Sequence, residues 1–212
     1  MSHPRLLLPA VLLLGGCLTL SACSQDSAQQ GSSPAATPSA QAVSSGPVQP
    51  NIWLTTPATG SPVTGKGYGF KLPAGWADIT QQIRSSQPEA GFDVAVQDAT
   101  DSDGFASYFT VLSSGVADMV GRTGFADFLK EELEGSGATG VVVLPETSLD
   151  GSRTLRLRGE MTQGKLTWHT EQWVVSHGQD TYVITFAANQ KTTDAKMAEI
   201  FGPVVSSWKW SA

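Results

Sequence analysis

The sequence predicts an α+β fold: a central antiparallel sheet flanked by helices, preceded by a signal peptide and a disordered tether. Three observations lead to this prediction. Alternating apolar and polar runs end in short Gly-containing turns, two segments carry apolar residues at helical spacing, and a Ser-, Ala- and Pro-rich stretch precedes both. We expect a signal peptide over residues 1–22, a lipidated tether over 23–65 and one globular domain over 66–212.

The expected strands are short runs in which apolar residues alternate with polar ones. Three joints between them, Asp150-Gly151, Gln163-Gly164 and Gly178-Gln179, are short and contain glycine. Since such turns connect neighbouring antiparallel strands, the last four strands should lie side by side. The expected strands cover residues 68–72, 92–97, 106–113, 141–144, 153–161, 166–176 and 181–188.

Two segments predict helices. The first covers residues 124 to about 134, with Thr123 as the expected N-cap. The second starts near Thr193-Asp194, and Gly202-Pro203 should kink or interrupt it because proline lacks a backbone N–H. One apolar stripe contains Phe125, Phe128, Leu129 and Leu133, and the other contains Ala198, Phe201, Val205 and Trp208.

The N-terminus predicts a lipid anchor. Arg5 precedes an apolar run over residues 6–20, which is shorter than the roughly 18 residues that a membrane span requires. The sequence Leu20-Ser21-Ala22-Cys23 resembles a lipobox, in which the cysteine thiol is acylated and becomes the first residue of the mature protein. Ordinary secretory cleavage, a transmembrane anchor and acylation of Cys17 are the alternatives.

Acylation of Cys23 would attach the protein to the lipid bilayer. A diacylglyceryl group brings two acyl chains such as palmitate, and two chains hold a protein to a membrane where one does not. We therefore expect a lipoprotein on the outer face of a bacterial cell membrane. The tether that follows contains one apolar segment, Ile52-Trp53-Leu54, which either docks on the domain or has no role.

Composition excludes several classes of function. Cys17 and Cys23 are the only cysteines, so the domain has neither a disulfide nor a cysteine-based metal site. The net charge of −6 argues against nucleic acid, because no basic cluster exceeds Arg153, Arg156 and Arg158. We expect a monomer with no cofactor and no metal.

The stretch from Tyr68 to Trp76, with its aromatic-x-Leu-Pro-x-Gly-Trp pattern, heads the domain. Together with the strand over residues 178–186 and the ending Ser207-Trp208-Lys209-Trp210, it resembles the PsbP/Mog1-like superfamily and, within it, the actinobacterial LpqN-type lipoproteins. This resemblance implies an antiparallel sheet flanked by helices, a lipidated tether and a non-catalytic envelope role. It also implies binding of amphiphilic molecules or membrane transport partners in some members.

An enzyme would need a catalytic group, and the best candidate is a pair on one strand. His169 and Glu171 share a face, so an imidazole and a carboxylate could act as base and orienter. A solvated surface pair is the simpler interpretation, and His177 is expected to be exposed at a hairpin end. No nucleophile elbow, Walker loop or dinucleotide fingerprint is present.

Tryptophan is abundant for a domain of this size. Most of these rings should seal the core, and Trp168 and Trp173 should lie on opposite faces of their strand. We expect a non-catalytic lipoprotein that binds an amphiphilic ligand, such as a glycolipid, or an envelope membrane protein. An envelope hydrolase and a structural accessory subunit are the alternatives. The candidate ligand-binding residues are Trp76, Phe128, Trp173 and Trp208.

Overall fold

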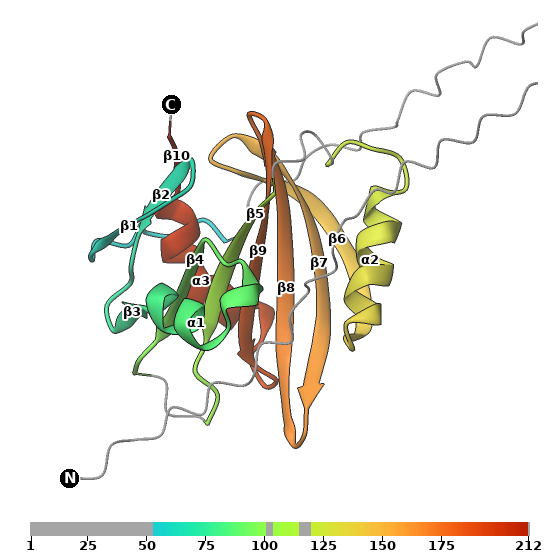
Figure 1. Cartoon of the computed structure of the whole chain (residues 1–212), viewed down its shortest axis with the longest axis horizontal. Coiled ribbons are helices and arrows are strands. Elements are labelled where there is room, and N and C mark those ends of the chain that lie inside the picture. The colour runs from blue at the N-terminus through green and yellow to red at the C-terminus, as the bar shows by residue number, and fades with distance from the viewer. Residues whose placement is uncertain (1–52, 101–103, 115–119, 212) are drawn as a thin grey trace, which may run out of the picture.

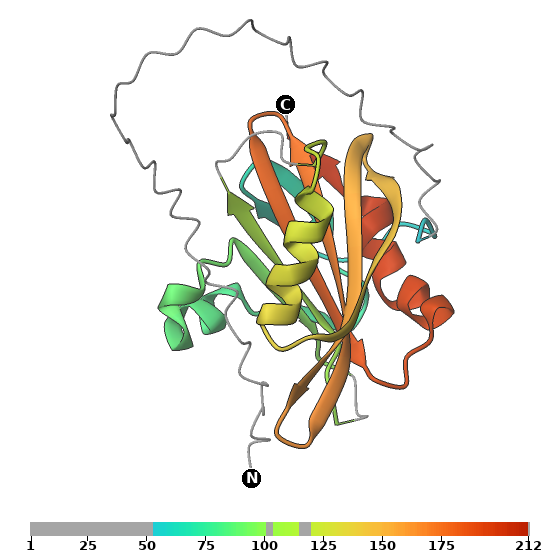
Figure 2. The same ribbon diagram turned by 90° about the vertical axis from the view of Figure 1, so that its right-hand side faces the viewer.

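The computed structural model describes residues 53–100, 104–114 and 120–211, which form two antiparallel sheets and three α-helices (Figures 1 and 2). The fold class is therefore α+β with a large central antiparallel sheet, as the sequence predicts. The strands of the large sheet are, in spatial order, β3 (Trp76–Asp78), β4 (Val94–Asp98), β5 (Tyr108–Ser114), β9 (Asp180–Asn189), β8 (Leu166–His177), β7 (Ser152–Gln163) and β6 (Thr139–Leu149).

A smaller sheet and the helices cover the large sheet. The small sheet contains β1 (Pro62–Gly65), β2 (Tyr68–Lys71) and β10 (Lys209–Trp210), with β2 in the middle. The helices are α1 (Thr80–Ser86), the 3₁₀ helix η1 (Pro88–Ala90), α2 (Phe125–Gly135) and α3 (Asp194–Ser207). None of the described helices is long and apolar enough to cross a membrane.

Strands β6 to β9 form the predicted run of antiparallel neighbours. At the first joint, Asp150 and Gly151 both have positive φ, 43° and 84°, as a two-residue hairpin turn favours. Strand β6 is longer than the predicted segment over 141–144. Register shifts interrupt its pairing with β7 on both sides of that segment, so the strand lacks the regular alternation on which the prediction depends.

Both predicted helices form, with differences at their caps. The residue at the N-cap of α2 is Gly124, at φ 77°, so the expected cap by Thr123 is wrong. In α3, the hydroxyl of Thr193 accepts a hydrogen bond from Lys196 N, and the helix continues through Pro203 to Ser207. The helix is therefore not interrupted at Gly202-Pro203, and its residues Phe201, Val204 and Val205 pack in the hydrophobic core.

The packed chain begins before the composition change at Lys66. Residues 53–61, which we call the strap, cross α3 and lead into β1, and β1 pairs with β2. Trp53 is fully buried, Ala58 is 7% exposed, and the neighbouring Leu54 is 63% exposed. The strap belongs to the folded part because one large buried ring offsets its polar composition. The signal peptide and Cys23 lie outside the described residues, as does Ile52.

The two faces of the large sheet carry different elements. Helix α3 and the small sheet cover one face, and α1 and α2 lie on the other (Figures 1 and 2). Trp173 packs on the α3 face and Trp168 on the α2 face, which confirms the prediction for this pair. The α3 face holds most of the aromatic rings and, unexpectedly, a set of buried charges.

Candidate functional site

The strap inserts Trp53 between the sheet and α3, where four side chains surround it. We call these four, Trp173, Phe186, Phe201 and Arg156, the Trp53 cage. The ring centroid of Trp53 lies 4.9 Å from that of Trp173, 5.0 Å from Phe186 and 5.9 Å from Phe201. The guanidinium carbon of Arg156 lies 5.8 Å from the Trp53 ring centroid, within cation–π range.

Strand register places the sheet side of the cage. Arg156 of β7 lies opposite Trp173 of β8, and Glu171 of β8 lies opposite Phe186 of β9. Because alternate residues of a strand share a face, these side chains all point towards α3. The sequence thus puts the cage on three neighbouring strands, and α3 closes it with Phe201.

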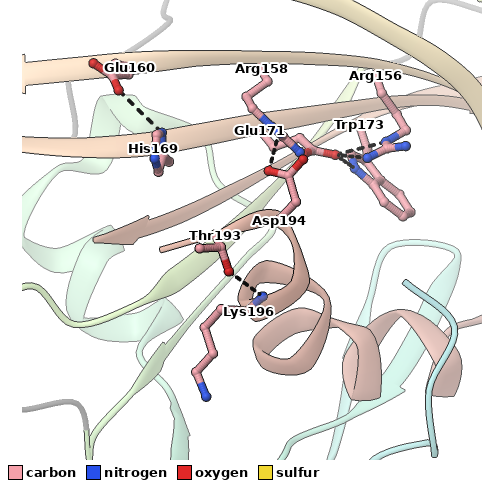
Figure 3. A network of polar contacts seen from close by, with 9 residues as sticks. All are labelled: Arg156, Arg158, Glu160, His169, Glu171, Trp173, Thr193, Asp194 and Lys196. Carbon is pink, nitrogen blue, oxygen red and sulfur yellow. Dashed lines mark hydrogen bonds and ion pairs between the residues drawn. The ribbon is translucent and has the colours of Figure 1, made fainter. Parts of the chain in front are cut away.

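A buried charge network adjoins the cage (Figure 3). The carboxylate of Glu171 is fully buried and accepts five hydrogen bonds. Its Oε1 accepts from Arg156 Nε at 2.9 Å, Arg156 Nη2 at 2.6 Å and Trp173 Nε1 at 2.8 Å. Its Oε2 accepts from Arg158 Nε at 3.1 Å and Nη2 at 2.9 Å. The carboxylate of Glu171 therefore fixes both arginines and Trp173, which forms one wall of the cage.

Arg158 extends the network to the start of α3. Its Nη1 donates to Asp194 Oδ1 at 2.5 Å, and the Asp194 side chain is 71% exposed. Burial acts to lower the pKa of Arg158, but the hydrogen bond to Asp194 and the charge of Glu171 outweigh it, so the pKa lies above its ordinary value. Two guanidinium groups thus share one buried carboxylate, and an exposed carboxylate supplies the remaining negative charge.

A glycine makes room for the strap on α3. A Cβ on Gly202 would lie 2.5 Å from the carbonyl oxygen of Trp53, closer than side chains tolerate. Two hydrogen bonds from backbone amides hold the strap over this position, from Thr55 N to Ser206 Oγ at 2.8 Å and from Ala58 N to Pro203 O at 2.9 Å. Trp53 therefore reaches the cage at a place where the helix carries no side chain beneath it.

Three of the four sequence-predicted ligand residues lie in the aromatic cluster of the α3 face. Trp173 is in the cage and fully buried, whereas Trp208 is 2% exposed and stacks on Tyr68 at 4.4 Å between ring centroids. Trp76 is partly buried against Phe201. Phe128 lies on α2, on the other side of the sheet, and is 39% exposed. The structure does not bring Phe128 to the other three.

The structure does not pair His169 with Glu171, and Glu171 is not solvated, contrary to the simpler interpretation of the sequence. Glu171 is buried among arginines, and the Nδ1 atom of His169 lies 3.8 Å from Glu160 Oε1 instead (Figure 3). His177 is half-buried rather than exposed, because its ring stacks on Trp210 at 4.4 Å between centroids. Within the described ranges, no group of three or more potential metal ligands comes together.

The sequence pattern does not reveal the charge network, because its arginines alternate with leucines on β7 and such alternation favours an outward-facing interpretation. One signal could have found it. The predicted hairpin at Gln163-Gly164 sets the register that puts Arg158 opposite Glu171. Opposite charges directly across a hairpin, with the Arg156 and Trp173 pair next to them in the same register, indicate a specific contact rather than two solvated groups.

A surface depression of about 550 Å³ lies between β1, α1 and β4. Arg84 and Asp93 bind each other there: Arg84 Nη2 donates to the backbone carbonyl of Asp93 at 2.7 Å and lies 3.9 Å from its carboxylate, which also accepts from the backbone N–H of Lys66 at 2.7 Å. Since these groups are already paired and the lining is largely polar, this depression suits an amphiphile less well than the Trp53 cage.

No family model matches the chain, and no curated protein matches it. Among solved structures, it is similar to cyanobacterial PsbP (CyanoP) from Synechocystis sp. PCC 6803, with 17% identity, coverage of 71% of this chain and 91% of that one, and a TM-score of 0.49. It is also similar to LpqN, involved in cell envelope biogenesis of Mycobacterium tuberculosis, with 14% identity, coverage of 72% and 86%, and a TM-score of 0.49.

A protein of Bacteroides thetaiotaomicron is similar at 9% identity and a TM-score of 0.45, with coverage of 72% of this chain. The chain spans about half of that protein, 49% of its length. These similarities concern the fold alone. PsbP and LpqN are the two kinds of protein that the sequence resemblance indicates.

Proposed function

We propose that the protein is a lipid-anchored, non-catalytic lipoprotein of the cell envelope whose domain binds an amphiphilic ligand. The Leu20-Ser21-Ala22-Cys23 motif supports the anchor and the location. The observation that carries the binding function is the Trp53 cage, in which aromatic walls adjoin the buried guanidinium group of Arg156. Aromatic and cationic groups side by side suit a ligand with an apolar part and a polar head.

The anchor is tested by replacing its acceptor cysteine. Cys23→Ser should abolish metabolic labelling with an alkyne fatty acid and leave an uncleaved precursor, because the thiol is the acylated group. Cys17→Ser is the matched control and should keep the label and the cleavage. Label that persists on the Cys23→Ser protein would show that acylation occurs elsewhere.

Ligand binding is tested on the intact chain with 11-(dansylamino)undecanoic acid, an anionic fluorescent amphiphile. We expect saturable binding that Trp173→Phe weakens by about 1 kcal/mol, because aromatic anchors dominate such sites. Trp168→Phe changes the same kind of residue on the same strand but on the opposite face, and it should leave binding unchanged. Equal effects of the two substitutions, or the absence of saturable binding, would contradict the proposal.

One observation favours hydrolysis as a second candidate function. Ser152 Oγ and His177 Nδ1 are 2.8 Å apart, the geometry of a nucleophile beside a base. The neighbouring Asp150 does not orient this histidine, since its oxygens accept from Lys209 Nζ and Trp210 N. We therefore expect a fluorophosphonate probe to leave the protein unlabelled. Labelling that Ser152→Ala abolishes would replace the binding function with an enzymatic one.

A further inference from the structure

We propose that Trp53 is an exchangeable plug, and that an amphiphile with an acyl chain and an anionic headgroup takes its place in the cage. This inference rests on the proposed binding function and names its site. Among the described residues, the strap contributes one aromatic ring to this site, that of Trp53. The aromatic walls of the cage belong to β8, β9 and α3. The walls therefore stay in place when the strap leaves.

Apart from the Trp53 ring, few buried side chains hold the strap on the domain. Trp53 and Ala58 are buried, whereas every residue from Leu54 to Pro57 is exposed. Withdrawal of Trp53 breaks the hydrogen bond between Thr55 N and Ser206 Oγ, whereas the bond between Ala58 N and Pro203 O can remain. Segments with few buried contacts open first, so the first half of the strap is the natural place for local opening.

Withdrawal of the strap uncovers an opening at Gly202. The helix has no side chain there, and the Trp53 backbone fills the space that a Cβ would occupy. An acyl chain that enters at this position meets Trp173, Phe186 and Phe201, the same apolar surfaces that bury the indole. The ligand thus replaces one apolar group by another without exposing the cage to water.

The charges select the headgroup. Arg156 and Arg158 share the single buried carboxylate of Glu171, and the charge balance is completed by Asp194 at the surface. The Asp194 side chain is 71% exposed, so a carboxylate or phosphate headgroup can take its position on Arg158 without desolvating a buried group. A cationic headgroup cannot take the place of Asp194, because it would meet the guanidinium group of Arg158 in place of a carboxylate.

The test uses the intact chain and 11-(dansylamino)undecanoic acid. Trp53→Ala should bind this probe about tenfold more tightly than the wild type, because no plug competes for the cage. Leu54→Ala is the matched control: it removes an exposed apolar side chain from the next residue and should leave the affinity unchanged. In the Trp53→Ala background, Arg158→Gln should weaken binding of the anionic probe, and a dansyl amine of the same chain length should bind poorly.

Amide hydrogen exchange of the wild type tests, without any substitution, whether the ligand displaces Trp53. Saturating probe should remove protection at Thr55, while Gly60, which donates to the Leu72 carbonyl, keeps its protection. Probe binding with unchanged Thr55 protection and no gain from Trp53→Ala would overturn the plug but leave the proposed function standing. Absence of saturable binding to the wild type would overturn both.

Discussion

The two faces of the large sheet are both buried, but by different kinds of residue. On the α3 face, aromatic rings form one cluster from the strap to β10, and the charges within it are paired. On the other face, apolar residues form two clusters, one under α2 and one under α1. A row of residues that pair with one another across the strands runs from one cluster to the other, and its polar members are uncharged. The row contains Leu157, Gln172, Thr185, Thr110 and Ala95.

Alternation along a strand therefore does not always separate core from solvent. On β8 it separates Glu171 and Trp173, which face α3, from Thr170 and Gln172, which face the other way, and all four are buried. Charge is placed on the face where arginines and an indole N–H group can satisfy it. The opposite face carries neutral polar groups between its clusters.

Glu171→Ala should be the most damaging substitution at the site. It leaves Arg156 and Arg158 beside each other without their shared carboxylate, and removal of one partner of a buried ion pair costs about 3–5 kcal/mol. Gln172→Ala, at the next residue on the opposite face, should cost about 1 kcal/mol because a neutral polar group is lost. Urea unfolding of both variants measures the two values. Similar losses would mean that the faces do not differ in this way.

Trp173→Ala and Trp53→Ala remove two fully buried indoles from the same cage. Trp173 lies on a central strand, so its truncation should lower the free energy of unfolding by about 3–5 kcal/mol. The cost at Trp53 is limited by the free energy that holds the strap, because the strap can detach while the rest stays folded. We expect a loss of about 1–3 kcal/mol there by urea unfolding. An equal or larger loss at Trp53 would show that the strap is an inseparable part of the core.

Gly202→Ala should detach the strap. The new Cβ collides with the Trp53 carbonyl, and this outweighs the gain of up to about 1 kcal/mol that alanine brings to a helix. The measurement is loss of exchange protection at the Thr55 amide. Gly135→Ala in α2 is the matched control, since nothing lies within 4 Å of the position that its methyl group would take and the helix should gain stability. Retained protection of the Thr55 amide in Gly202→Ala would contradict the close contact between the strap and α3 at Gly202.

His169→Ala should have the smallest effect. The imidazole is 3.8 Å from Glu160 at a partly exposed position, and such pairs contribute a few tenths of a kcal/mol. Unfolding and probe binding should both match the wild type. Turnover of a p-nitrophenyl ester by the wild type that disappears in His169→Ala would instead assign a catalytic role to this residue.

The pairing of β6 to β9 can be predicted because it depends on local signals: the short glycine turns between these strands and, on β7 to β9, alternation. Strands β1, β3 and β10 cannot, since two to four residues are too few to show a period. Trp173 can be chosen as a candidate from the sequence because the large ring of a tryptophan usually packs in a core or lines a binding site. The burial of Glu171 depends on α3 and the strap reaching the same face, and no local pattern records that contact.

The strap also determines the order in which the domain can be completed. Thr55 and Ser206 are 151 positions apart, so this contact cannot form until almost the whole chain is present. The segment that leaves the ribosome early is therefore among the last to be secured, as expected for contacts between distant parts of a chain. Until then the cage lacks its indole. The last step of folding and the release of the proposed ligand then involve the same movement: Trp53 returns to the cage.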